Sequence, residues 1–196
     1  MSFYKTKRPF ILASGSPRRK ELLTTLGLPF EILVSDLDES FPLDMSPEAV
    51  PSFLSAKKAK AIFSIRPEAL ILASDTVVVS QHSILNKPLD LHEARVMLEL
   101  LSGKTHFVYT SFTLIDKNSE KTITDRVDVA FKKLTGKEID YYLKNGKPAD
   151  KAGAYGIQEW IGLVAVERID GSYYTVMGLP THLLWKALVD GGHIED

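Results

Sequence analysis

Three side chains near the start of the sequence, Ser14, Arg18 and Arg19, are suited to binding an anion. They stand where the apolar run Ile11–Ala13 gives way to small polar residues, and Pro17 suits the first position of a helix. The first turn of a helix has unpaired N–H groups and the positive end of the helix dipole, so two arginines there favour a bound anion, phosphate above all. The same residues also fit a solvated basic turn with acidic neighbours, and this stretch alone leaves both interpretations open.

Two carboxylates stand out by their surroundings. Asp75 interrupts the most apolar run of the chain, residues 69–79, and an unpaired buried charge is costly, so we expect Asp75 to be paired, to bind a metal or to end a strand. Glu39 lies in the acidic segment 35–40, which is either a solvated loop or a loop that points a carboxylate at a bound cation. The residues Ile71–Ser74 repeat Ile11–Ser14. If the repeat is meaningful, both strands end at the same edge of a sheet, where open α/β sheets bind ligands.

Two lysines complete the set of candidate side chains. Lys58 falls within the apolar face of an expected helix, four residues from Leu54 and four from Ile62. Its ammonium either stays in water above the core or is led along the core to a functional site. Lys87 lies in a turn before Pro88. Cations neutralise a polyphosphate, whereas carboxylates contribute only as metal ligands or as a base, so the set favours metal-assisted hydrolysis of a phosphoanhydride with Mg²⁺ or Mn²⁺.

The sequence lacks the residues that several other kinds of catalytic or binding site require. There is no cysteine, which excludes a disulfide, a thiolate metal site and a thiol nucleophile. The five histidines are not paired at metal-ligand spacing, and neither a serine elbow nor a dinucleotide glycine motif is present. The residues Gly103-Lys104-Thr105 look like the end of a P-loop, but Leu98 occupies the position where that motif requires glycine.

Local patterns predict the elements that position these side chains. Helices are expected after the serine-proline pairs at 16–17 and 46–47, the second running to about residue 65, over 91–101, from the cap at Thr135 to Gly146, and over 180–189. Capping pairs at Asp90 with Glu93 and at Thr135 with Glu138 mark two of these starts. Strands are expected near 9–13, 29–34, 69–79, 105–115 and 122–131, followed by a hairpin of 161–169 with 172–176. The glycine-rich loop 147–156 is long enough to be functional.

This order of elements predicts a single domain over residues 1–196, of mixed α/β or α+β class, built around one large sheet. A chain that is 44% hydrophobic can bury a real core. Lys and Arg number 24 against 25 Asp and Glu, and the net charge of −1 argues against binding of long nucleic acid. The apolar run that starts at Pro9 is too short for a signal peptide, and no run is long enough to span a membrane, so we expect a soluble cytoplasmic protein without a membrane partner.

The opening motif Ala13-Ser14-Gly15-Ser16-Pro17-Arg18-Arg19, followed by Glu21-Leu22-Leu23, resembles the signature of the Maf family of nucleotide pyrophosphatases. The resemblance continues in order over nearly the whole chain. Its further pieces are Glu39, Lys58-Ala59, Ala73-Ser74-Asp75-Thr76-Val77, Lys87-Pro88, Leu101-Ser102-Gly103-Lys104-Thr105-His106, Asp150-Lys151-Ala152-Gly153-Ala154-Tyr155-Gly156-Ile157-Gln158 and Val176-Met177-Gly178-Leu179-Pro180. Each piece alone is moderately specific, whereas the ordered set is highly specific.

The resemblance implies a fold like that of the inosine triphosphate pyrophosphatases, with a long mixed β-sheet and two lobes that flank a central cleft. It implies hydrolysis of a nucleoside triphosphate to the monophosphate and pyrophosphate, with Mg²⁺, Mn²⁺ or Co²⁺ as the divalent cation. It implies a homodimer as well. The site residues that it implies are Asp75 as the base that activates water, Glu39 and Asp75 as metal ligands, Ser14, Arg19, Lys58 and Lys87 as phosphate contacts, and Arg18, Thr76 and Gln158 as determinants of base choice.

Within the family, Asp75-Thr76 and Gly156-Ile157-Gln158 resemble the subgroup that hydrolyses dTTP and UTP. A primary amide such as that of Gln158 offers a donor beside an acceptor, which complements O4 and N3–H of uracil or thymine. Glu159-Trp160 departs from the subgroup, which commonly has glycine after the glutamine, so base preference stays open. The alternatives are the subgroup that hydrolyses 7-methyl-GTP and, because the family is associated with inhibition of septum formation, a regulator that senses nucleotides without turnover.

Overall fold

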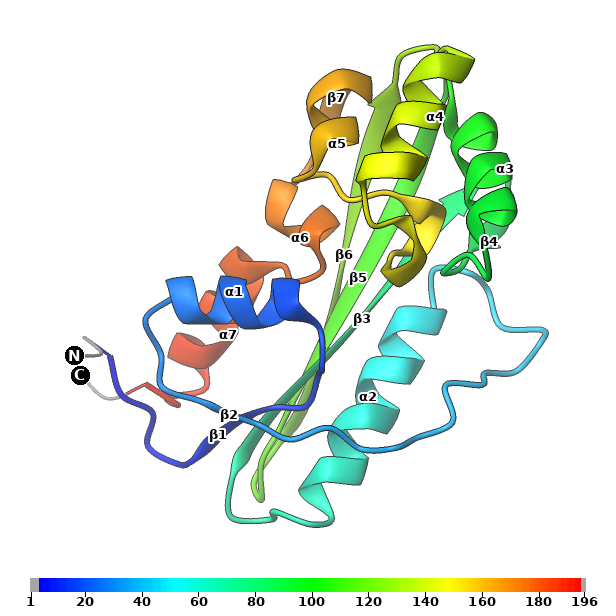
Figure 1. Ribbon diagram of the computed structural model, residues 1–196. Coiled ribbons are helices and arrows are strands. Elements are labelled where there is room, and N and C mark those ends of the chain that lie inside the picture. Colours follow the sequence, from blue (N-terminus) through cyan, green and yellow to red (C-terminus); the bar gives the residue numbers. More distant parts are fainter. Residues whose placement is uncertain (1–3, 195–196) are drawn as a thin grey trace. The chain divides into compact units, whose positions relative to one another are not determined.

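The computed structural model describes residues 4–194, and Figure 1 shows their helices and strands. The chain divides into two compact units, each assembled from separate segments of the sequence. The first unit contains the described residues of Met1–Asp75, Thr110–Asp125 and Gly178–Asp196, and the second contains Thr76–Tyr109 and Arg126–Met177. Both units include parts of three long strands, β3 (Leu70–Ser80), β5 (Thr105–Ile115) and β6 (Glu120–Phe131).

In the first unit, two short strands pair in parallel beside the start of β3. The central one, β1 (Phe10–Leu12), pairs with β2 (Glu31–Ile32) on one side and with β3 on the other. The helices of this unit are α1 (Pro17–Thr25), α2 (Val50–Phe63) and α7 (Thr181–Asp190). Ala59 and Ile62 of α2 join Ile11, Ile71 and Ile115 in one buried apolar cluster. Burial of these side chains holds α2 against the strands, and with it the lysines on its neighbouring positions.

The second unit carries the remaining elements. They are β4 (Ser83–Leu85), α3 (Leu91–Leu101), α4 (Gly136–Asn145), the 3-10 turns η1 (Pro148–Asp150) and η2 (Ala152–Ala154), α5 (Trp160–Ala165), β7 (Val166–Asp170) and α6 (Tyr173–Met177). Helix α3 contacts α4 and both 3-10 turns, and Figure 1 shows α3 next to α4. The strand β7 pairs antiparallel with the end of β6, with Val129 opposite Ile169.

Within the described residues, 4–194, the strands belong to one seven-stranded sheet in the order β2-β1-β3-β5-β6-β7, with β4 paired to β3. The pairings of β1 are parallel, whereas those of β4 with β3 and of β7 with β6 are antiparallel. This confirms the predicted mixed α/β class with one large sheet. Among residues 4–194, no helix combines the length and the apolar character needed to cross a membrane.

Two predicted helix starts are confirmed by their caps. The Asp90 side chain accepts a hydrogen bond from the Glu93 N–H at 2.8 Å, and α3 begins at the next residue, Leu91. The Thr135 side chain accepts from the Glu138 N–H while the Glu138 carboxylate accepts from the Thr135 N–H at 2.8 Å, which is a complete capping box for α4. Local sequence fixes both starts because each cap uses groups within three residues of one another.

The hairpin predicted from 161–169 and 172–176 is wrong. Residues Trp160–Ala165 form α5, whose buried side chains Ile161 and Ala165 are four positions apart and therefore lie on one helical face. A Cβ at Gly162 would lie 1.8 Å from the Ile157 carbonyl oxygen, so only glycine allows the helix this close to the preceding chain. Residues Tyr173–Met177 form α6, and β7 pairs with β6 instead of with this segment.

Two further boundaries differ from the prediction. Helix α2 begins at Val50 instead of after Ser46, because the Ala49 N–H closes a separate turn on the Ser46 carbonyl at 2.9 Å. Pro51 occupies the first turn of α2, as expected. The second strand is shorter than predicted, with only Glu31–Ile32 in β2.

Candidate functional site

The turn between β1 and α1 holds Ser14 and Arg19 in contact with each other. Ser14 is buried, and its Oγ accepts hydrogen bonds from the Ser16 N–H at 3.3 Å and from Arg19 Nη1 at 3.2 Å. Ser16 occupies the N-cap position with an extended backbone, and Pro17 follows as the first helical residue. The predicted strand, turn and helix are therefore confirmed, and the turn brings a hydroxyl and a guanidinium together at the start of a helix.

Arg19 is fixed by a second contact and lies among charged neighbours. Its Nε donates to the Gly178 carbonyl at 2.9 Å. Burial lowers the pKa of the Arg19 guanidinium from its ordinary value, Asp75 and Glu39 oppose this shift, and Arg18 adds to it. A guanidinium keeps its proton in proteins, so Arg19 supplies a permanent positive charge beside the two carboxylates.

The ammonium of Lys58 contacts both candidate carboxylates. Its Nζ donates to Asp75 Oδ1 at 2.6 Å and lies 3.0 Å from Glu39 Oε1. The side chains of Lys58 and Asp75 are 14% and 11% exposed, whereas that of Glu39 is 55% exposed. The Lys58 ammonium is therefore mostly withdrawn from water and is paired with two carboxylates.

The two copies of the repeated motif lie on neighbouring strands, β1 and β3. Ile11 is paired with Ile71 and Leu12 with Leu72 in parallel register, and the Ala13 N–H donates to the Leu72 carbonyl at 2.7 Å. The two segments pair in parallel, but the expectation that both strands end at the same edge of the sheet is wrong, because β1 ends at Leu12 whereas β3 continues to Ser80. Ser14 lies just beyond the carboxyl end of β1, a position where such sheets bind ligands, and Asp75 lies within β3.

Sequence reasoning missed two groups that hold this part of the first unit in place. The Gly178 carbonyl accepts from both Arg19 Nε and Ser74 Oγ, the latter at 3.1 Å, and Gly178 has a φ of 114°. Lys57 Nζ donates to the carbonyls of Asp38 at 2.7 Å and of Ser40 at 3.3 Å, on either side of Glu39. The glycine in the Val176–Pro180 motif signalled the first group, whereas nothing in the sequence singled out Lys57 from its neighbours.

Three predicted residues lie in the second unit. Thr76 is half-buried on β3, and Lys87 is exposed in the turn after β4. The Asn86 carbonyl accepts a hydrogen bond from the Gly153 N–H at 3.2 Å, which joins the turn of Lys87 to the glycine-rich loop. Gln158 is exposed directly after that loop. Lys87 and Gln158 are therefore carried by two segments that contact each other within this unit.

Glu39 and Asp75 are the carboxylates that the prediction assigns to a divalent metal, and both lie against the Lys58 ammonium. Within residues 4–194, no group of three or more His, Cys, Asp or Glu side chains is arranged to hold a metal ion. Mg²⁺ is commonly bound by one or two carboxylates together with water and substrate phosphates. The oxygen donors present therefore fit a metal that binds together with a polyphosphate better than one held by the protein alone.

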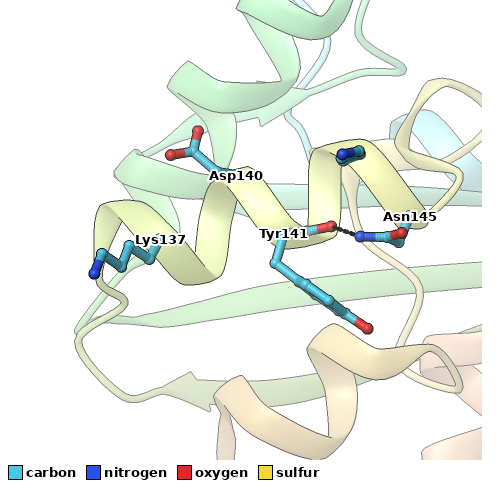
Figure 2. Close-up of a pocket in the computed structure, with 5 residues that line it drawn as sticks. Lys137, Asp140, Tyr141 and Asn145 are labelled. Carbon is cyan, nitrogen blue, oxygen red and sulfur yellow. Dashed lines mark hydrogen bonds between the residues drawn. The ribbon is translucent and has the colours of Figure 1, made fainter.

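An open hollow of about 460 Å³ on α4 contains none of the predicted site residues. It is lined by Lys137, Asp140, Tyr141, Lys144 and Asn145, all exposed and all from one helix. Figure 2 shows the Asn145 amide donating to the Tyr141 carbonyl, at 2.8 Å. Ligand sites usually enclose most of a ligand between several elements, so this hollow is a feature of the surface and not the candidate site.

Comparison with known proteins identifies a family, close relatives and a similar fold. The family model described as "Maf-like protein" matches residues 9–190. The chain is similar to a Porphyromonas gingivalis protein named "dTTP/UTP pyrophosphatase", at 45% identity over 95% of this chain and 96% of that one. It is similar to a Bacillus cytotoxicus protein of the same name, at 46% identity over 92% of this chain and 94% of that one. The structure of the Staphylococcus aureus Ham1 protein has a similar fold, with a TM-score of 0.50 and 13% identity over 94% of this chain and all of that one.

Proposed function

The chain belongs to the Maf-like protein family, and from that premise we propose that it hydrolyses dTTP and UTP to the nucleoside monophosphate and pyrophosphate. The reaction and the two substrates are those in the names of relatives that are about 45% identical over most of the chain. The structural observation that carries the proposal is the contact of one ammonium, Lys58, with the buried Asp75 and with Glu39. Cations and carboxylates in mutual contact suit binding and hydrolysis of a polyphosphate.

The proposed base is Asp75. Its Oδ1 accepts from Lys58, and a carboxylate has a second oxygen that can accept a proton from water. Removal of that proton lets the water oxygen bond to the α-phosphorus while the bond from the α-phosphorus to the bridging oxygen of the β-phosphate breaks, which releases pyrophosphate. The Lys58 contact supports this role because it fixes the orientation of the carboxylate.

Phosphate binding is proposed for Ser14, Arg19, Lys58 and Lys87. The contacts of Arg19 with Ser14 and with the Gly178 carbonyl hold its guanidinium before any ligand arrives. Preorganised cations of this kind stabilise charge that develops on phosphate oxygens without reorganising during the reaction. A divalent metal held by Glu39 and Asp75 would neutralise part of the phosphate charge.

We propose that Arg18, Thr76 and Gln158 determine which nucleotide base is bound. The exposed amide of Gln158 follows a buried loop and has the donor and acceptor needed for O4 and N3–H of a pyrimidine. The names of the relatives support dTTP and UTP over 7-methyl-GTP. We also propose a cytoplasmic location, as expected from the sequence, and a homodimer, which rests on the family resemblance. Light scattering of the purified protein tests the dimer.

A substrate panel tests the proposed function. The purified protein is incubated with dTTP, UTP, CTP or 7-methyl-GTP in the presence of Mg²⁺, Mn²⁺ or Co²⁺, and pyrophosphate release is measured. We expect dTTP and UTP to give the highest kcat/KM, and chelation of the metal to abolish turnover. Dominant hydrolysis of 7-methyl-GTP would assign the chain to the other subgroup. Nucleotide binding without turnover under all conditions would support the regulatory alternative.

A further inference from the structure

The segment that ends at Gln158 is buried along most of its length. Residues 153–157 are buried, and Gln158 is the first exposed side chain after them. Gly153 and Ala154 have positive φ angles of 68° and 60°, so the loop follows a specific backbone path. An exposed amide at the end of such a path is placed by the backbone beneath it, which raises the question of what holds that backbone.

Glu159, the residue directly after Gln158, is bound through both of its carboxylate oxygens. Its Oε1 lies 2.8 Å from Lys151 Nζ, and its Oε2 accepts from the Tyr142 hydroxyl at 2.5 Å. The same hydroxyl accepts from the Gly156 N–H at 3.1 Å. We call these three side chains, Tyr142, Lys151 and Glu159, the Glu159 brace. It joins α4, the glycine-rich loop and the residue after Gln158.

The brace is sheltered from water. The Lys151 side chain is 4% exposed and that of Glu159 is 22% exposed, and Tyr142 is buried. Lys151 Nζ also contacts the Lys147 carbonyl and Asp150 Oδ1. Burial raises the pKa of Tyr142, and the Glu159 carboxylate raises it further, so the phenol keeps its proton and remains a donor at working pH. Charge-assisted hydrogen bonds in such surroundings are strong and geometrically specific.

The loop backbone is pressed against the brace. A Cβ at Gly156 would lie 2.7 Å from Lys151 Cε and 3.0 Å from the Glu159 carboxyl carbon. The Glu159 N–H donates to the Gly156 carbonyl at 2.9 Å, which closes a turn around Gln158. Backbone and side-chain contacts therefore fix the chain on both sides of Gln158. The exposed Gln158 thus lies between two residues whose positions are fixed, Gly156 and Glu159.

We propose that Glu159, with Lys151 and Tyr142, is a positioning residue that holds Gln158 in place for recognition of the pyrimidine base. This inference rests on the proposed function, in which Gln158 binds O4 and N3–H of uracil or thymine. Cytosine presents the reverse pattern, a donor at N4 and an acceptor at N3, so a primary amide accepts it by turning over. Discrimination of UTP from CTP thus requires a fixed amide and not merely its presence. The residue in which the sequence departs from its subgroup, Glu159, supplies contacts that fix the backbone next to this amide.

The test compares kcat/KM for UTP and CTP in wild type, Glu159→Ala, Glu159→Gln and Tyr142→Phe. The ratio of the two values is the readout, because it is independent of the fraction of folded enzyme. Glu167→Ala is the matched control, since Glu167 is an exposed glutamate of the same unit. We expect the ratio to fall about fivefold or more in Glu159→Ala, which is the value of one lost hydrogen bond of about 1 kcal/mol. We expect smaller falls in the other two brace variants and no change in Glu167→Ala.

The outcomes separate this inference from the proposed function. If wild type prefers UTP and the ratio is unchanged in all three brace variants, the inference is overturned and the proposed function stands. If wild type does not discriminate UTP from CTP, the inference is overturned as well. If wild type hydrolyses neither dTTP nor UTP, the proposed function fails, and the inference fails with it.

Discussion

Lys58 Nζ donates to Asp75 Oδ1 at 2.6 Å, so the carboxylate in the most apolar run of the chain is paired with an ammonium from the opposing helix α2. The apolar cluster that contains Ala59 and Ile62 holds α2 against β1 and β3, and it thereby sets this contact. A buried carboxylate and the cation that stabilises it thus follow from ordinary core packing.

Replacement of Lys58 tests the strength of that pairing. Lys58→Met keeps the apolar stem but leaves Asp75 largely buried and without this ammonium, so we expect unfolding free energy to fall by about 1–3 kcal/mol at neutral pH. Urea denaturation measures the change. Lys60→Met is the matched control on the same helix, because the Lys60 side chain is 58% exposed, and there we expect a change within about 0.5 kcal/mol. Equal stability of the two variants would show that the contact contributes nothing to the fold.

Replacement of Lys57 is expected to weaken metal binding while leaving the free energy of unfolding nearly unchanged. It donates to the carbonyls of Asp38 and Ser40, so Lys57→Ala should loosen the loop that carries Glu39. We expect the metal concentration for half-maximal activity to rise several-fold, and calorimetry with a non-hydrolysable nucleotide should show weaker metal binding. Unfolding free energy should change by no more than about 0.5 kcal/mol, since the loop is exposed. A metal response identical to that of Lys60→Ala would contradict this role.

His106 should make the protein less stable in mild acid. Burial lowers the pKa of His106 to about 4, from an ordinary value of 6.5. Between these values the unfolded chain binds a proton that the folded chain does not, so this stability is complete above pH 6.5 and falls as pH falls, by on the order of 3 kcal/mol at pH 4.

Urea denaturation of wild type and His106→Phe at several pH values measures this component. The variant leaves the buried Tyr155 hydroxyl without its contact to His106, which is 2.8 Å long in wild type, and that cost is the same at each pH. Wild type should therefore lose its advantage over the variant as the pH is lowered from 6.5 to 4. If the difference in unfolding free energy between wild type and variant stayed constant across this pH range, burial would not lower the pKa of His106.

The parts of the fold that were predictable depend on neighbouring residues. The capping groups at Asp90 and Thr135 lie three residues from their partners, and both helices begin where those pairs indicate. The repeat of Ile11–Ser14 at Ile71–Ser74 also carried spatial information. The two copies pair in parallel, with Ile11 opposite Ile71 and Leu12 opposite Leu72. For Lys58, helical spacing alone did not decide between an ammonium in water and one led along the core, and its pairing with Asp75 was not predicted.

The parts that were missed depend on contacts between distant segments. The segment 161–169 reads as one strand, but its first part, to Ala165, belongs to helix α5, in which Gly162 packs onto the Ile157 carbonyl. Likewise, the departure at Glu159 gave no hint of its partners Tyr142 and Lys151, which are 17 and 8 positions away in the sequence. Neither periodicity nor propensity carries such information, because the contacts exist only after the loop has packed.

The most direct test of the proposed catalytic role is turnover and nucleotide binding by Asp75→Asn, measured on the same preparation. Asparagine keeps the size of the side chain but cannot accept the proton from water, so pyrophosphate release from dTTP and UTP should fall by about 100-fold or more. Binding of the nucleotide, measured by calorimetry, should be largely retained, and Asp44→Asn, which changes an exposed carboxylate, should behave as wild type. Turnover by Asp75→Asn equal to that of wild type would contradict the account.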